Sequence, residues 1–134
     1  MKKNLLVLLL LLSSFAIHAQ QVASGYVYND ANKNGRKDRS EVGIPNVGVS
    51  NGTHVVLTDK DGRYSLPVFD GNTIFVIKPS GYSTPVDDHF IPQFYYHHKP
   101  SGSPDYLTFQ GVAPTGELPK SVNFPLYKEN EPEN

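Results

Sequence analysis

The stretch DANKNGRKDRSE, from Asp30 to Glu41, has the residue types and spacing of a calcium-binding loop. Oxygen-bearing side chains stand at its first, third, fifth, ninth and twelfth positions, and Gly35 stands at the sixth, where a sharp turn is needed. Calcium takes about six to eight oxygen ligands, which alternating positions and a final carboxylate can supply. The predicted ligands are Asp30, Asn32, Asn34, the backbone carbonyl of Arg36, Asp38 (directly or through water) and Glu41.

The charges within this loop limit how tightly an ion would bind. Four basic and three acidic side chains give the loop a formal charge of +1, so we expect a weak dissociation constant of ~10⁻⁴ to 10⁻³ M. The alternative interpretation is a polar connection that is rich in turn formers and binds no ion. A bound ion would have a structural role, because it stabilises the folded state by mass action.

A second group of possible ligands lies further along the chain. His97 and His98, with Asp87, Asp88 and His89 upstream, offer the imidazole and carboxylate groups that zinc or nickel accept. Adjacent residues of an extended segment point to opposite sides, however, so His97 and His98 are poorly placed to share one ion. The sequence favours polar and stacking roles at the surface for these side chains.

The aromatic run Phe94, Tyr95 and Tyr96, followed by His97, is a candidate binding surface. Aromatic faces give a large contact area with a polar tip, which suits sugar rings. The simpler interpretation is that these side chains cover the core or dock onto a neighbouring domain. Asn51-Gly52-Thr53 has the form of a glycosylation sequon but is more simply a turn.

The elements that must position these residues read as short strands. Apolar and polar residues alternate with a period of two, and turn chemistry recurs at intervals of about ten residues, which predicts an all-β sandwich of prealbumin-like or Greek-key type. Asn51-Gly52 is predicted to be a hairpin turn in which both residues adopt positive φ. The expected strands are 22–28, 47–50, 53–57, 63–68, 73–78 and 121–127, with further turns at Asp61-Gly62 and Asp70-Gly71-Asn72.

The chain changes character between Pro79 and Pro125. This stretch holds 8 of the 11 prolines, which cannot donate backbone hydrogen bonds, so regular sheet or long helix throughout is excluded. It is also rich in aromatics, which argues against disorder. We therefore expect an ordered, extended segment that wraps the sandwich.

The two ends of the chain are predicted to lie outside the folded domain. Residues 1–19 have the lysines, short apolar run and small residues of a signal peptide cleaved after Ala19, and that run is too short to span a membrane. The domain is expected over 20–127, and 128–134 form a polar tail or linker. The expected location is periplasmic or extracellular. The near-neutral charge suggests no nucleic-acid partner, and the chain has no cysteine.

The residues also resemble known modules. GYVYNDANKNGRKDRSEVGIPNVGVSNGTHVVLTDKDGRYSLP is similar to the B-type calcium-binding repeats of bacterial surface adhesins and to related prealbumin-like modules. KPSGYSTPVDDHFIPQFYYHHKPSGSPDY, followed by GVAPTGELPKSVNFPLY, resembles the N-terminal domain of secreted calcineurin-like metallophosphoesterases, common in Bacteroidetes. The resemblance covers about Val22 to Tyr127 and implies a catalytic domain partner in cis or in trans.

The chain lacks the motifs that such a catalytic domain needs. A two-metal phosphoesterase uses D-x-H, G-D and G-N-H segments to clamp a phosphate between two ions. Asp87-Asp88-His89 is formally D-x-H but stands alone, and Gly71-Asn72 is followed by threonine. We therefore expect a non-catalytic accessory or interaction module. A carbohydrate-binding or adhesive module is the alternative, and a phosphoesterase in its own right is the least favoured interpretation.

Overall fold

The computed structural model describes residues 20–107 and 111–130, and the predicted signal peptide and the last residues of the predicted tail lie outside these ranges. The described residues form eight strands and no helix, so none of them forms a helix that could cross a membrane. The strands are β1 (Gln21–Asn29), β2 (Gly48–Ser50), β3 (Val55–Leu57), β4 (Arg63–Val68), β5 (Thr73–Ile77), β6 (Tyr82–Ser83), β7 (Tyr95–His97) and β8 (Phe124–Lys128).

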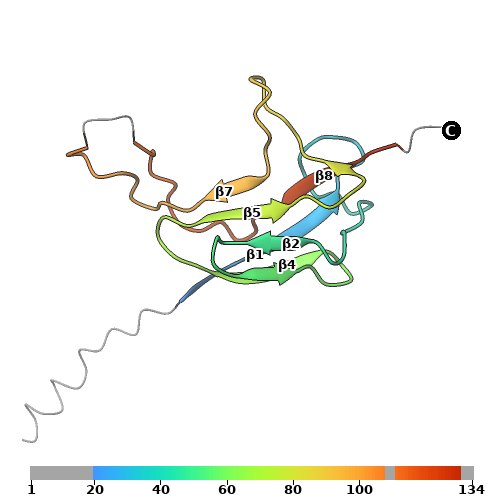
Figure 1. Ribbon diagram of the computed structural model, residues 1–134, viewed down its shortest axis with the longest axis horizontal. Coiled ribbons are helices and arrows are strands. Elements are labelled where there is room, and N and C mark those ends of the chain that lie inside the picture. Colours follow the sequence, from blue (N-terminus) through green and yellow to red (C-terminus); the bar gives the residue numbers. More distant parts are fainter. Residues whose placement is uncertain (1–19, 108–110, 131–134) are drawn as a thin grey trace, which may run out of the picture.

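The strands form two sheets of four, in the orders β4-β1-β8-β6 and β3-β2-β5-β7 (Figure 1). β1 pairs antiparallel with β4 on one side and parallel with β8 on the other, so the first and last strands lie together at the centre of one sheet. Strands β4 and β5 follow one another in the chain but belong to different sheets. The predicted all-β sandwich is therefore confirmed.

Alternation along the strands builds the core. In β4, Tyr64, Leu66 and Val68 are buried while Arg63 and Ser65 are exposed, which is the two-residue period of a strand with one face inward. The Tyr64 hydroxyl donates a hydrogen bond of 2.6 Å to the Val122 carbonyl, so the polar end of this buried ring is satisfied. Residues from both sheets complete the core: Ala23, Val27, Ile44, Val47, Val49, Ile74, Val76, Val122, Phe124 and Leu126.

The predicted turn at Asn51-Gly52 joins β2 to β3 but has a different geometry from the one expected. Ser50 pairs with Val55, so the loop has four residues, and only Gly52 has positive φ, at 90°. The Asn51 side chain organises the turn, because its Oδ1 accepts hydrogen bonds from the amides of Thr53 and His54. Asn51 is buried and its Nδ2 donates to the Pro67 carbonyl, which leaves no free amide for glycosylation in the folded chain.

The proline- and aromatic-rich segment contains two strands that the sequence did not predict. β6 pairs antiparallel with β8, and β7 pairs antiparallel with β5, so the segment adds one edge strand to each sheet. Between them, residues 84–94 leave the body of the sandwich as a projecting hairpin, seen at the top of Figure 1. The described remainder of the segment, 98–107 and 111–123, forms no further strand and contains turns at 100–101 and 105–106.

Candidate calcium loop and aromatic groove

The loop begins where β1 ends, with the side chain of Asp30 turned inward. Asp30 is 1% exposed, and its carboxylate accepts hydrogen bonds from the amides of Asn34 (3.1 Å) and Gly35 (2.8 Å). Gly35 has φ of 72°, and a Cβ there would meet no atom within 4 Å, so the requirement for glycine comes from the backbone conformation alone. The chain is thereby wrapped around the first predicted ligand.

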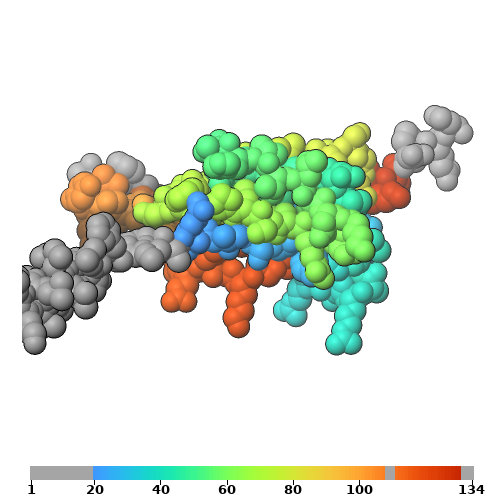
Figure 2. Space-filling model, turned by 90° about the horizontal axis from the view of Figure 1, so that it is seen from below, coloured from blue at the N-terminus to red at the C-terminus, as the bar shows by residue number. Residues whose placement is uncertain are grey.

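Glu41 closes the loop from its other end. Its carboxylate accepts hydrogen bonds of 3.0 Å from the amides of both Ala31 and Asp38, and the residue is 8% exposed. Because Ala31 follows Asp30 directly, this contact ties the first and last positions of the loop together. Parts of this region, drawn in cyan, project from the body of the sandwich in the space-filling view (Figure 2).

The Asp38 carboxylate accepts hydrogen bonds from both predicted amide ligands, Asn32 and Asn34. The Nδ2 atoms of Asn32 and Asn34 lie 2.8 and 2.9 Å from Asp38 Oδ2. These hydrogen bonds, helped by the charges of Arg36 and Lys37, hold the pKa of Asp38 below its usual range. Asn34 Oδ1 in turn accepts a hydrogen bond of 2.8 Å from the amide of Arg36.

A buried hydroxyl lies beside this loop without a partner. Tyr28 is fully buried in β1, and its hydroxyl has no hydrogen-bond partner among the described residues. Burial raises the pKa of Tyr28 well above its usual value, and the nearby charges of Asp30, Glu41 and Asp38 raise it further. The Tyr28 hydroxyl is therefore a buried polar group that is influenced by the charges of the loop carboxylates.

The donor set fits calcium better than it fits a transition metal. Within residues 20–107 and 111–130, no three His, Asp or Glu side chains form a group that could hold a metal by themselves, and this includes the three loop carboxylates. Asp30 and Glu41 are buried, yet neither takes part in an ion pair within these ranges. Calcium accepts amide and carbonyl oxygens beside carboxylates, and a cation would compensate these two buried charges.

The predicted aromatic surface is divided between solvent and core. Phe94 and Tyr95 are exposed and meet edge to face at 5.5 Å between ring centroids. Tyr96, on the other side of β7, packs against the core cluster, and its buried hydroxyl has no partner among the described residues. His97 Nδ1 lies 2.9 Å from Thr73 Oγ1 in the neighbouring strand.

The surface role predicted for His98 is wrong. His98 is 1% exposed, and its Nε2 lies 3.0 Å from Gln21 Oε1 in β1. His97 contacts β5 and His98 contacts β1, so the two imidazoles have no partner in common. Strand alternation at β7 explains the separation, because it turns successive side chains to opposite faces.

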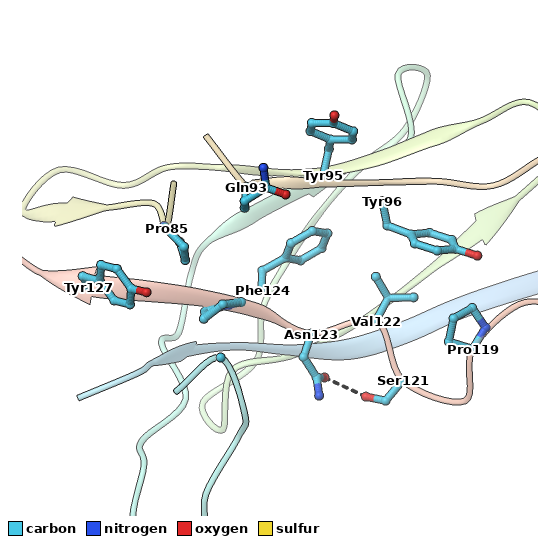
Figure 3. A pocket seen from close by; sticks show the side chains of 12 residues that line it. Pro85, Gln93, Tyr95, Tyr96, Pro119, Ser121, Val122, Asn123, Phe124 and Tyr127 are labelled. Atoms are coloured by element: carbon cyan, nitrogen blue, oxygen red, sulfur yellow. Dashed lines mark hydrogen bonds between the residues drawn. The ribbon is translucent and has the colours of Figure 1, made fainter. Parts of the chain in front are cut away.

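A groove of about 430 Å³ opens between β7 and β8 (Figure 3). Its wall on one side is β7, with Tyr96 turned inward and Tyr95 on the opposite side of the strand; β8 contributes Phe124 and Tyr127. None of the described residues that line the groove carries a charge. Lys33 of the calcium loop lies 5.0 Å from the centroid of the Tyr127 ring, so the loop adjoins the groove. The other lining residues are Gly35, Pro85, Gln93, Pro119, Ser121, Val122, Asn123 and Pro125.

The isolated D-x-H triplet is part of a structural turn. Asp87 Oδ1 accepts hydrogen bonds of 2.9 Å from the amides of His89 and Ile91, and Asp87 Oδ2 accepts one of 3.2 Å from Gln93 Nε2. The carboxylate is therefore used to shape the projecting hairpin. His89 is exposed there, and no metal-holding group of three His, Asp or Glu side chains includes it among the described residues.

The sequence did not reveal the groove, because its walls are far apart in the chain. Alternation predicted a last strand, but not that Phe124 and Tyr127 of this strand would line the same groove as Tyr96. That arrangement depends on the pairing of β8 with β1 and β6. The only signal for the groove in the sequence was the aromatic content of the two segments that contain β7 and β8.

Comparison with protein families identifies the module. Residues 31–114 match the family described as the N terminal of calcineurin-like phosphoesterase. Comparison with curated proteins finds no match. The matched range begins at the second residue of the candidate calcium loop, continues past the projecting hairpin and covers more than half of the chain. The chain belongs to the family of N-terminal domains of calcineurin-like phosphoesterases.

Proposed function

We propose that this chain is an exported, non-catalytic accessory module that positions a phosphoesterase catalytic domain, in cis or in trans. The observation that carries the proposal is the family match over residues 31–114, because the family is defined by its place in front of a phosphoesterase. The apolar run and small residues within 1–19 support export. The sandwich would act by holding its partner in a fixed place.

The assignment as non-catalytic is supported by the use of Asp87 in a turn and is tested by an activity assay. We expect the chain, with Mn²⁺ or Zn²⁺, to hydrolyse an aryl phosphate no faster than the metal ion alone. Two-metal hydrolysis needs several converging ligands, and Asp87 already accepts three hydrogen bonds within its own hairpin. The His89→Ala variant should behave identically. Metal-dependent turnover that His89→Ala abolishes would contradict the proposal.

The same proposal includes a structural calcium ion in the loop from Asp30 to Glu41. Two buried carboxylates support it, since neither forms an ion pair with the residues that the structure describes, and so does the Tyr28 hydroxyl, which has no hydrogen-bond partner among those residues. The ion would compensate the buried charges and pin the connection between β1 and β2. The residues that would hold it are Asp30, Asn32, Asn34, the carbonyl of Arg36, Asp38 and Glu41.

Calcium is expected to raise the melting temperature of the chain. With ~1 mM Ca²⁺ and a dissociation constant of ~10⁻⁴ M, mass action adds about 1.4 kcal/mol, or roughly 5 °C for a domain of this size. Differential scanning calorimetry with Ca²⁺ and with chelator measures the shift. Glu41→Gln should remove it, because the last carboxylate of the loop is lost.

Glu117→Gln is the matched control, since Glu117 is exposed and lies outside the loop. It should retain the full calcium-dependent rise. Identical melting curves with Ca²⁺ and with chelator would contradict the calcium assignment and leave the loop as a connection held by its own hydrogen bonds.

A saccharide ligand for the groove is the second candidate function. It is favoured by the amides of Gln93 and Asn123 and by the absence of charge among the described lining residues. The buried Tyr96 hydroxyl, which has no hydrogen-bond partner within the described part of the chain, favours it as well. Aromatic rings flanked by amide and hydroxyl groups suit a neutral polyhydroxylated ring. The accessory role remains the principal proposal, because the family match supports it directly.

A further inference from the structure

The projecting hairpin (residues 84–94) presents apolar side chains to solvent on a well-defined support. Phe90 is 84% exposed at its tip, and Val86 and Ile91 are each about half exposed. The backbone beneath them is held by a bridge between Val86 and Pro92 and by the hydrogen bonds that Asp87 accepts. An exposed apolar cluster on a supported turn is typical of a docking surface.

The conformation of Phe90 strengthens this interpretation. Phe90 has φ of 62°, in the left-handed region that bulky residues rarely occupy. Its amide donates a hydrogen bond of 2.9 Å to the Asp87 carbonyl, which fixes this conformation. Glycine or asparagine would fit there with less strain. An aromatic residue in a strained, exposed position points to a role outside the isolated domain.

The hairpin begins beside the point where the chain leaves the sandwich. Tyr82 of β6 pairs with Lys128 at the end of β8, and the Glu129 amide donates a hydrogen bond of 2.9 Å to the Gly81 carbonyl. In Figure 1 the hairpin projects at the top of the molecule, and the chain leaves β8 toward the right. A domain that follows β8 in the chain would therefore be joined beside the base of the hairpin.

We propose that the tip of the projecting hairpin, with Phe90 at its centre, inserts into the phosphoesterase domain that this module accompanies. This inference rests on the accessory role proposed above and names the surface that would carry it. Exposed Asp88 adjoins the apolar tip, so the partner surface should offer an apolar pocket with a basic rim. The base of the hairpin lies beside the end of β8, where Tyr82 pairs with Lys128, and this position favours a domain that follows β8 over a second copy of the chain or a lipid surface.

Hydrogen exchange of the full chain, alone and joined behind Asn134 to the phosphoesterase domain of a two-domain family member, tests the inference. We expect amides of residues 86–94 to exchange at least tenfold more slowly in the joined protein. Phe90→Asp should abolish that protection. The variant should still fold, because Phe90 is exposed and aspartate tolerates positive φ better than phenylalanine.

Val55→Asp is the matched control, because Val55 is an exposed apolar residue on the edge strand β3. It should leave the protection unchanged. Protection confined to another surface would overturn the hairpin assignment and keep the accessory role. An absence of protection on every surface would overturn both. A concentration-dependent dimer of the chain alone that Phe90→Asp dissociates would assign the tip to a second copy and overturn the inference.

Discussion

Replacing Gly62 by alanine is expected to destabilise the sandwich by more than about 4 kcal/mol, a large part of the roughly 5–15 kcal/mol that ordinarily stabilises a domain. Gly62 has φ of +76°, and a Cβ there would lie 2.4 Å from the Val27 carbonyl oxygen and 2.6 Å from Gly43 Cα. Both neighbours are backbone atoms, so no side chain can rotate away. Urea denaturation followed by circular dichroism measures the loss.

Gly52→Ala is the control for this prediction. Gly52 also has positive φ, at +90°, but a Cβ there would meet nothing within 4 Å. The substitution should therefore cost only the conformational strain, about 1 kcal/mol. If Gly62→Ala destabilises the chain no more than Gly52→Ala does, the close backbone crossing is not the reason for glycine at position 62.

The crossing at Gly62 also positions the calcium loop. The Val27 amide donates to the Gly62 carbonyl and the Ile44 amide donates to the Val27 carbonyl, each at 2.8 Å. Gly43 lies between them, and a Cβ there would lie 1.9 Å from the Asp61 carbonyl oxygen. The backbone segments at Val27, Gly43–Ile44 and Asp61–Gly62 are therefore in contact. Because Gly43 follows Glu41 by two residues, these contacts fix the position of Glu41, the last predicted calcium ligand.

The sequence predicted the elements with strong local signals and missed those that depend on distant partners. The strand at 63–68 was predicted with its observed bounds, because its alternation is regular and a turn precedes it. β6 and β7 have only two and three residues, too few for a period to show. The Asn51 turn departed from expectation because the buried side chain makes a contact with Pro67 that no local rule contains.

The candidate sites also divide into one with a local sequence signal and others that depend on contacts between distant parts of the chain. The calcium loop is contiguous, so its residues could be named from spacing, and the structure adds the burial of Asp30 and Glu41. The groove and the projecting hairpin depend on which strands become neighbours. His98 illustrates the limit, since its burial arises from a contact with Gln21 that lies 77 residues away.

β1 and β8, the first and last strands of the domain, lie outside the matched family range but complete one of the two sheets of the sandwich. The match covers 31–114, whereas β1 ends at Asn29 and β8 begins at Phe124. These two strands pair with each other at the centre of the sheet β4-β1-β8-β6. A folded unit therefore needs residues on both sides of the match.

Removing β8 is expected to abolish cooperative unfolding, and Leu126→Ala is expected to destabilise the full chain by about 3 kcal/mol. Leu126 is fully buried in the core, and its carbonyl accepts a hydrogen bond of 2.9 Å from the Asp30 amide, so β8 also holds the first residue of the calcium loop. Leu57→Ala, at an exposed position, should cost less than about 0.5 kcal/mol. Urea titration compares the variants with a chain that stops at Lys120. If that shortened chain unfolds with the midpoint and slope of the full chain, β8 does not contribute to the free energy of unfolding. The position of the loop would then depend on β1 alone.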